Sequence, residues 1–222
     1  RPPIANVDCF VVVFSIAKPT PNYRIIDKFL IMAEMNNTDA IICINKEDLV
    51  TDKSETNIVD VYKDIYPTVF VSGKTGEGLE KLSAMISNKK VALAGPSGVG
   101  KSTILNQLIP SAMMETGSIS EKTKRGKHTT RHVEIFELEN GGMIFDTPGF
   151  TSFEILEAEE DSLMDYYPEM LKYKGHCKYD DCRHVKEPGC KVIEAVKNGE
   201  INKMRYSSYL ENMNEIRTKK KY

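Results

Sequence analysis

The residues with the clearest chemical meaning form a glycine-rich stretch in the middle of the chain, Gly95-Pro96-Ser97-Gly98-Val99-Gly100-Lys101-Ser102-Thr103. This stretch fits the phosphate-loop pattern G-x-x-x-x-G-K-[ST], whose glycines let backbone N–H groups turn inward and hold a polyphosphate at a helix N-terminus. Lys101 is expected to reach the β- and γ-phosphates, and the hydroxyl of Ser102 to ligate Mg²⁺. A strand predicted just before the stretch and a helix predicted just after it support this interpretation.

Two further patterns predict that the bound nucleotide is GTP or GDP. Asn45-Lys46-Glu47-Asp48 follows an apolar run and fits the N-K-x-D element of GTPases. Asp48 is expected to accept hydrogen bonds from N1–H and the N2 amino group of guanine, and such an acceptor discriminates against adenine by roughly 10⁴ to 10⁵. The Lys46 stem would lie along the base, and the Asn45 side chain would brace neighbouring loops. Ser72-Gly73-Lys74 is similar to the S-A-K element, whose backbone N–H meets guanine O6.

A third element, Asp146-Thr147-Pro148-Gly149, follows a short apolar run and matches D-x-x-G. Asp146 is expected to hold Mg²⁺, and the Gly149 N–H to sense the γ-phosphate. Because loss of that phosphate frees the segment that follows, the element predicts a nucleotide-dependent switch.

The polar, basic stretch 118–132 lies between the phosphate loop and this element. We predict a loop that orders when Mg·GTP binds and that supplies Thr130, in preference to Thr129, to the Mg²⁺ shell. Phe150 stands where Ras-like enzymes carry a glutamine that orients the attacking water, so unassisted hydrolysis should be slow. A partner or a loop side chain must complete the site. The candidates within the loop are His128 and His132.

A cluster near the C-terminus has the spacing of metal ligands, C-x₄-C-x-H-x₅-C. Three thiolates and one imidazole form a closed tetrahedral set for one structural Zn²⁺, with no position left for water. The predicted ligands are Cys177, Cys182, His184 and Cys190, with His176 as the alternative to His184. The surrounding basic residues either touch RNA phosphates or are simply solvated. They are Lys178, Arg183, Lys186 and Lys191.

Strands alternating with helices are predicted to position these motifs. Apolar, β-branched runs occupy residues 7–16, 40–44, 68–71, 91–94 and 143–145, and helical spacing occupies 23–35, 77–86 and 104–109. This alternation predicts an α/β fold, a mostly parallel sheet with helices on both faces and binding loops at the carboxyl ends of its strands. From about residue 155 the pattern is helix and loop. We therefore predict a GTPase domain over 1–154 and a small α-helical zinc-binding domain over 155–222.

Composition narrows the class of protein. The 222 residues are 41% hydrophobic and 28% charged, with a net charge of −2, which is typical of a soluble protein without general attraction for nucleic acid. The apolar runs are too short to span a bilayer and no signal peptide is recognisable, so we expect a cytoplasmic protein without a membrane partner. Cys9 and Cys43 lie in apolar runs and are expected to be core thiols.

The order of the motifs is unusual, because the two guanine elements precede the phosphate loop. Since the site is assembled from loops at one sheet edge, rejoining the chain elsewhere leaves those loops in place, and the order predicts a circular permutation. The switch after Asp146 then leads directly into the C-terminal domain.

The chain resembles the circularly permuted, ribosome-small-subunit-dependent GTPase A family (RsgA, also called YjeQ or YloQ). The likeness rests on residues 1–8, 95–103, 126–130, 146–150, 181–184, 187–190, 195–201 and 205–209. It implies a GTPase that binds the 30S subunit and its 16S rRNA late in maturation, is stimulated by it, and carries zinc in its C-terminal domain. It also implies an N-terminal OB-fold that is absent from this sequence, and Arg1 in place of Met suggests a start inside a longer polypeptide. We expect a monomer.

Two other classes compete with this interpretation. Guanylate kinases share a very similar phosphate loop but do not need N-K-x-D or D-x-x-G. A zinc-dependent RNA-binding scaffold that binds nucleotide without turnover is the second, and Phe150 favours it. Hydrolysis of GTP with and without 30S subunits would separate these classes.

Overall fold

The computed structural model describes residues 6–50, 58–109, 134–146 and 158–219. Contacts within the chain divide it into two units. The first unit comprises residues 1–21 and 37–153, and the second comprises residues 22–36 and 154–222. The helix at 23–35, which the predicted domain 1–154 includes, is thereby grouped with the C-terminal residues. The domain boundary between 154 and 155 stays a prediction.

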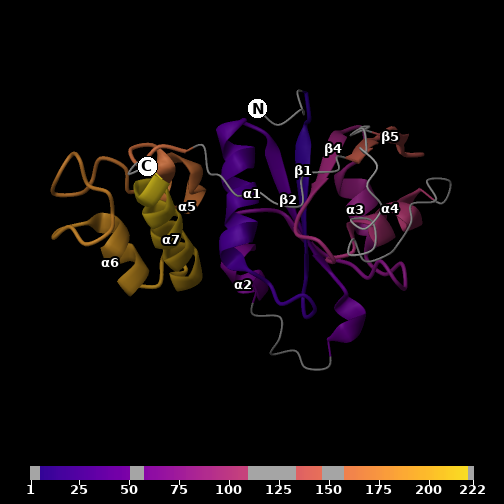
Figure 1. The fold of residues 1–222 in the computed structure, drawn as a ribbon, viewed down its shortest axis with the longest axis horizontal. Helices are drawn as coiled ribbons and strands as arrows, with labels where there is room; N and C mark the ends of the chain where they lie inside the picture. The colour runs from indigo at the N-terminus through magenta and orange to yellow at the C-terminus, as the bar shows by residue number, and fades with distance from the viewer. Residues whose placement is uncertain (1–5, 51–57, 110–133, 147–157, 220–222) are drawn as a thin grey trace. The chain divides into compact units, whose positions relative to one another are not determined.

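A six-stranded sheet forms the first unit's centre (Figure 1). Its strands are β1 (Cys9–Ser15), β2 (Asp39–Asn45), β3 (Thr68–Phe70), β4 (Lys90–Ala94), β5 (Glu134–Glu137) and β6 (Met143–Asp146). Their spatial order is β3-β2-β1-β4-β6-β5. All neighbouring strands are parallel except β5 and β6, so the predicted mostly parallel sheet is confirmed and one edge is antiparallel. β1 is buried along its whole length, which explains its nearly continuous apolar sequence.

The carboxyl ends of the parallel strands meet at one edge of the sheet. Ser15 of β1 lies in register with Asn45 of β2, and Val12 of β1 with Ala94 of β4. β3 runs beside β2 in the same direction, and β6 beside β4. Every nucleotide motif follows one of these strand ends, so segments far apart in the sequence are gathered at a single edge.

The helices of the first unit are α2 (Val59–Tyr62), α3 (Leu79–Met85) and α4 (Lys101–Leu108), with a 3₁₀ turn η1 at Glu47–Leu49. Helix α4 begins three residues before the start predicted from apolar spacing. Gly100 has a left-handed φ of 98° and leads directly into the helix, whose first turn is polar and therefore carries no hydrophobic periodicity. Helices α3 and α4 contact each other.

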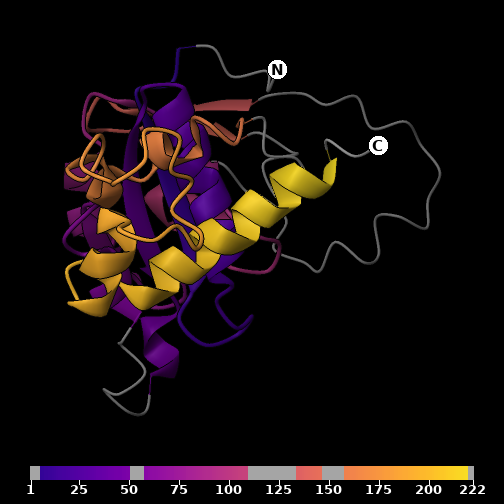
Figure 2. The same ribbon diagram turned by 90° about the vertical axis from the view of Figure 1, so that its left-hand side faces the viewer.

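The described residues of the second unit form helices joined by loops, with no strand among them. It consists of α1 (Tyr23–Met35), the 3₁₀ turn η5 (Leu163–Tyr166), α5 (Pro168–Leu171), α6 (Lys191–Lys197) and α7 (Lys203–Lys219), the long yellow helix of Figure 2. Tyr167 and Tyr209 meet edge to face in its core, with ring centroids 5.2 Å apart. None of the described helices has the length and apolar character needed to cross a bilayer.

Candidate functional site

The phosphate loop connects β4 to α4 and depends on glycine at two positions. Gly95 has a φ of 139°, and a Cβ there would collide with the Val13 carbonyl of β1. At Gly100 a Cβ would collide with the Asn45 side-chain amide. The loop backbone is therefore pressed against β1 at Gly95 and against the N-K-x-D element at Gly100, which leaves no room for a side chain at these two positions.

Lys101 is folded over the phosphate loop. Its Nζ donates to the carbonyls of Gly95, at 2.7 Å, and of Pro96, at 2.9 Å. Ser102 and Thr103 are half-buried in the first turn of α4, whereas Ser97 and Gly98 are exposed. The ammonium group thus stands at the loop that its sequence pattern assigns to phosphate.

Asn45 joins the phosphate loop to the guanine elements. Its buried side chain donates from Nδ2 to the Val99 carbonyl at 2.8 Å. Its Oδ1 accepts from the backbone N–H of Gly73 at 2.9 Å and of Lys46 at 2.8 Å. One side chain at the end of β2 therefore holds three loops in a fixed relation, because both ends of its amide are satisfied.

Lys46 and Asp48 project from the turn that follows β2. Lys46 has a left-handed φ of 68°, and its Nζ donates to the carbonyls of Gly98, at 2.9 Å, and of Lys18. Burial lowers the pKa of Lys46, against the opposing effect of Asp48. The exposed carboxylate of Asp48 accepts from the Oγ of buried Ser72 at 2.7 Å, which orients it.

The remaining residues of the two guanine elements are Glu47, Gly73 and Lys74. Burial, and secondarily the neighbouring carboxylate of Glu77, raise the pKa of Glu47. Gly73 is buried, and a Cβ there would lie 3.3 Å from atoms of Ile104 and of Thr103. Glycine therefore fits this position more easily than alanine would. Lys74 is exposed.

The part of the predicted site that faces the γ-phosphate is described only at Asp146, the last residue of β6, which pairs with Glu134 of β5. The other predicted residues lie outside the described part of the chain. They are His128, Thr129, Thr130, His132, Gly149 and Phe150.

One neighbour of the guanine element is not predicted by any sequence pattern. The segment that follows β1 contacts N-K-x-D through its backbone, because Ile16 N–H donates to the Asn45 carbonyl at 3.0 Å and the Lys18 carbonyl accepts from Lys46 Nζ. Backbone contacts of this kind place no constraint on side-chain type, so no residue pattern signals them.

The four predicted zinc ligands lie together in the second unit. The Sγ atoms of Cys177, Cys182 and Cys190 and a ring nitrogen of His184 are all within 4.8 Å of one another. The individual S···Nδ1 distances are 3.6, 3.4 and 3.3 Å. Three thiols and one imidazole at this spacing fit a tetrahedral Zn²⁺ site. His176 is exposed and does not belong to the group.

The protonation chemistry of these ligands is consistent with metal binding. Burial lowers the pKa of His184, so its imidazole is neutral and can donate a lone pair. In the metal-free state burial raises the pKa of Cys182 to about 12 and also raises that of Cys190. A metal must therefore displace protons from these thiols when it binds.

The loop that carries the ligands is braced from two sides. The Glu187 carboxylate accepts from the backbone N–H groups of Arg183, Val185 and Lys186 at 2.8 to 3.1 Å. From α7, Tyr206 donates to the His184 carbonyl and Tyr209 to the Arg183 carbonyl, each at 2.8 Å. These bonds support the loop from outside the ligand set, as partners around a metal site commonly do.

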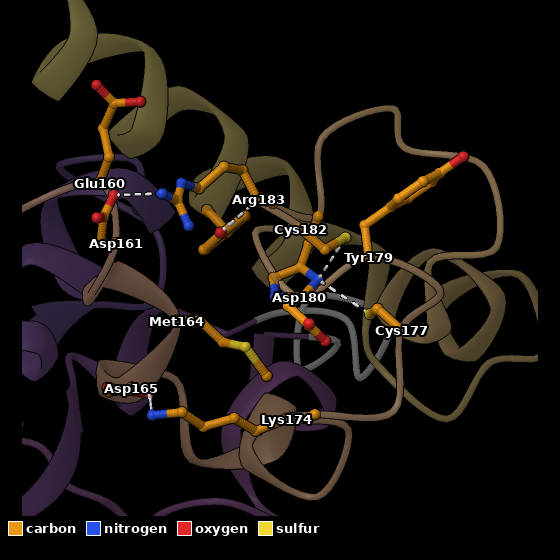
Figure 3. Close-up of a pocket in the computed structure, with 13 residues that line it drawn as sticks. Glu160, Asp161, Met164, Asp165, Lys174, Cys177, Tyr179, Asp180, Cys182 and Arg183 are labelled. Atoms are coloured by element: carbon orange, nitrogen blue, oxygen red, sulfur yellow. Dashed lines mark hydrogen bonds and ion pairs between the residues drawn. The ribbon is translucent and has the colours of Figure 1, made fainter.

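A cavity of about 330 Å³ lies beside the cluster (Figure 3). Arg183 points to Asp161 across it, with an N···O distance of 2.6 Å, and Lys174 points to Asp165 at 2.5 Å. Lys191, the first residue of α6, pairs with Glu194 at 2.7 Å. Two of the four cations in the predicted basic surface thus already have carboxylate partners within the unit.

Replacing Gly95 by alanine should test the close approach of the phosphate loop to β1. We expect the nucleotide-free variant to lose several kcal/mol of unfolding free energy, since backbone must shift to admit the Cβ. Gly98→Ala is the matched control, because Gly98 also has a left-handed φ, 78°, but nothing lies within 4 Å of a Cβ there. Its cost should be only about 1 kcal/mol. Equal losses in denaturant titrations of the two variants would contradict the prediction.

Comparison with known proteins gives a consistent result. The model of the RsgA GTPase family matches residues 1–156. The small ribosomal subunit biogenesis GTPase RsgA of Agathobacter rectalis is 42% identical over 223 positions, covering 100% of this chain and 74% of the relative. Its counterpart in Clostridium kluyveri is 45% identical, covering 100% and 77%.

Two solved structures are also similar. YjeQ from Thermotoga maritima has a TM-score of 0.83 and 36% identity, covering 96% of this chain and 72% of that one. YloQ, described as a circularly permuted GTPase, has a TM-score of 0.79 and 35% identity, covering 99% and 71%. The resemblance drawn from the sequence is thereby confirmed, together with its permuted α/β fold.

Proposed function

Because the chain belongs to the RsgA GTPase family and is therefore a GTP hydrolase, we propose that it acts in late maturation of the small ribosomal subunit, which stimulates its turnover. The observation that carries the nucleotide assignment is the Asn45 side chain, which bonds at once to the phosphate loop and to the Gly73 loop. The Gly73 loop and the phosphate loop are therefore close enough for one GTP molecule to place its base at the first and its phosphates at the second.

Guanine recognition is assigned to the loops after β2 and β3. Asp48, oriented by Ser72, accepts from N1–H and the N2 amino group, while the stem of Lys46 covers one face of the base. The backbone at Gly73 and Lys74 meets O6, and Glu47 is the variable residue of the element. Binding of adenine would leave the Asp48 carboxylate unpaired, which is the source of selectivity.

Phosphate binding and hydrolysis are assigned to the loops after β4 and β6. Backbone N–H groups of the non-proline residues in 95–103 cradle the phosphates, and Lys101 exchanges its two loop carbonyls for the β- and γ-phosphate oxygens. Mg²⁺, when bound, neutralises charge that develops on these oxygens. Its proposed ligands are Ser102, Thr130 and Asp146. Gly149 senses the γ-phosphate, and His128 or His132, or a group from the ribosome, places the attacking water.

The C-terminal cluster is assigned one structural Zn²⁺, held by the three thiolates and the imidazole that lie within 4.8 Å of one another. The metal would add folding free energy to a unit with a small core. We further propose that the unit contacts 16S rRNA, that nucleotide state reaches it through the segment after Asp146, and that the protein works as a cytoplasmic monomer.

The deciding experiment measures GTP hydrolysis with and without purified 30S subunits. Stimulation on the order of 10²-fold or more is expected, since a partner that completes a GTPase site has effects of this size or larger. Two controls accompany it. The Lys101→Ala variant should show no stimulation by 30S subunits, and the unaltered chain should show none by 50S subunits. Equal rates with and without 30S subunits would refute the proposed role, and phosphate transfer to GMP would indicate a kinase instead.

A further inference from the structure

Helix α1 joins two strands of the sheet, β1 and β2, yet it is held by helices of the C-terminal unit. The Asp27 carboxylate of α1 accepts from the Arg205 guanidinium of α7, and both side chains are 0% exposed. The same guanidinium bonds Glu169 of α5 at 2.7 and 3.2 Å and lies over the Tyr167 ring, 4.6 Å from its centroid. We name Asp27, Glu169 and Arg205 the buried triad.

A second group of charges holds the same two helices together. The Glu215 carboxylate of α7 accepts from Lys28 of α1 at 2.7 Å, from Arg24 of α1, and from Lys219 of its own helix at 2.9 Å. Burial by itself would raise the pKa of Glu215, but the hydrogen bonds and charges of Lys28 and Lys219 outweigh it and lower the pKa to about 2. Glu215 therefore stays ionised at physiological pH, so protonation does not remove its attraction for Lys28.

The buried triad is better explained by positioning than by stability. Desolvation of buried charges offsets most of their mutual attraction, so well-packed apolar residues of similar volume are often as stable. Apolar contacts lack the directional geometry of hydrogen bonds. A guanidinium bonded to carboxylates from two helices permits one register of α1 along α7, whereas apolar side chains tolerate slippage.

The flanks of α1 lead directly to the guanine element. Residues 16–22 connect β1 to α1, and this segment bonds the element twice, through Ile16 N–H to the Asn45 carbonyl at 3.0 Å and through the Lys18 carbonyl to Lys46 Nζ. At the other end, three residues connect α1 to β2, the strand that ends at Asn45. A shift of α1 along its axis would therefore pull on residues 16–22, whose first residues contact Asn45 and Lys46.

From this arrangement we infer that the C-terminal unit sets the nucleotide affinity of the guanine site through α1. The buried triad fixes α1 on α7, and residues 16–22 pass that position to Asn45 and Lys46. This inference rests on the proposed function in one respect, the assignment of N-K-x-D as the guanine-binding element. Asp27, Glu169 and Arg205 are positioning residues, and a partner that shifts the C-terminal unit changes how long guanine nucleotide stays bound.

The test replaces the buried triad by apolar residues in one variant, Asp27→Leu/Glu169→Met/Arg205→Met, in the zinc-loaded chain. Fluorescent GDP should dissociate about tenfold faster and the KM for GTP should rise by about the same factor, in the range found for coupling between sites. The kcat at saturating GTP should not change, because the triad touches neither phosphate nor the reacting atoms. Amide exchange should also accelerate within residues 16–22.

Arg217→Met is the matched control. It removes an ion pair of α7 with Glu160, 2.9 Å long, that does not involve α1, so dissociation and KM should stay at wild-type values. If the triad variant does not fold, Glu215→Gln weakens the second group of charges with the triad intact, and GDP should then leave about two- to threefold faster.

Wild-type GDP dissociation in a folded triad variant would overturn the inference, as would an equal acceleration in Arg217→Met. If only Glu215→Gln folds, wild-type dissociation in that variant overturns it. These measurements need no ribosome. Failure of 30S subunits to stimulate hydrolysis would therefore defeat the proposed function and leave this result standing.

Discussion

Changing Asp48 to asparagine should weaken GTP and GDP binding by about 10³-fold or more, on the scale seen when a site built to hydrogen-bond one partner meets the wrong one. The carboxylate offers two acceptors to the N1–H and N2 amino donors of guanine. An amide presents one acceptor and one donor, and the donor would face a donor of the base. Ser72 Oγ holds Oδ1 of Asp48 at 2.7 Å, so the group cannot simply turn away to avoid the conflict.

Xanthosine nucleotides provide the rescue, because xanthine carries a carbonyl in place of the amino group at C2 and can accept from the new amide. The variant should therefore bind XDP better than GDP when both are measured by calorimetry. Asp60→Asn is a suitable control, since Asp60 is an exposed carboxylate that pairs with Lys63 of its own helical region. Undiminished GDP affinity in Asp48→Asn, or ATP bound as tightly as GTP by the unaltered chain, would show that Asp48 does not recognise the base.

Removal of the metal should unfold the region around the cysteine cluster. In the Cys190→Ser variant, or after treatment with a strong chelator, we expect loss of one equivalent of zinc and of several kcal/mol of unfolding free energy. Cys190 is 4% exposed and immediately precedes α6, so its thiolate links the ligand loop to that helix. Without the metal, the buried thiols stay protonated because burial raises their pKa values, and neutral thiols contribute little to the free energy of unfolding.

Metal analysis and thermal unfolding of the same samples decide this prediction. Cys43→Ser serves as the control, because Cys43 is also fully buried but lies in β2, so it should lose about 1 to 3 kcal/mol for the buried hydroxyl while keeping its zinc. A Cys190→Ser protein that retains a full equivalent of zinc and melts at the wild-type temperature would mean that the four residues are not a metal site.

Local features of this protein were predictable from sequence because they depend on backbone conformation and on short spacing. Helix α1 was expected at residues 23–35 and is found there, since its apolar residues recur at helical spacing and Asn22 caps its first turn by accepting from Ile25 N–H. The glycines of the phosphate loop likewise follow from left-handed φ values that other residues avoid. The family, and with it GTP hydrolysis and the permuted fold, also followed from motifs of this local kind.

Contacts between segments distant in the sequence, and element boundaries without a hydrophobic pattern, were not predictable in the same way. The start of α4 was placed three residues late because its first turn is polar, and the antiparallel pairing of β5 with β6 depends on a register that no short pattern records.

The division of the chain into two units depends on contacts that the sequence does not reveal. By sequence α1 belongs between two strands of the GTPase half, but its Asp27 pairs with Arg205, 178 residues away, and its contacts group it with the C-terminal unit. Spacing along the chain specifies which residues share a helix face, because the backbone repeats at a constant interval. It does not specify which distant helix covers that face. That choice depends on how side chains of the whole molecule pack and neutralise one another, and only the tertiary structure reveals it.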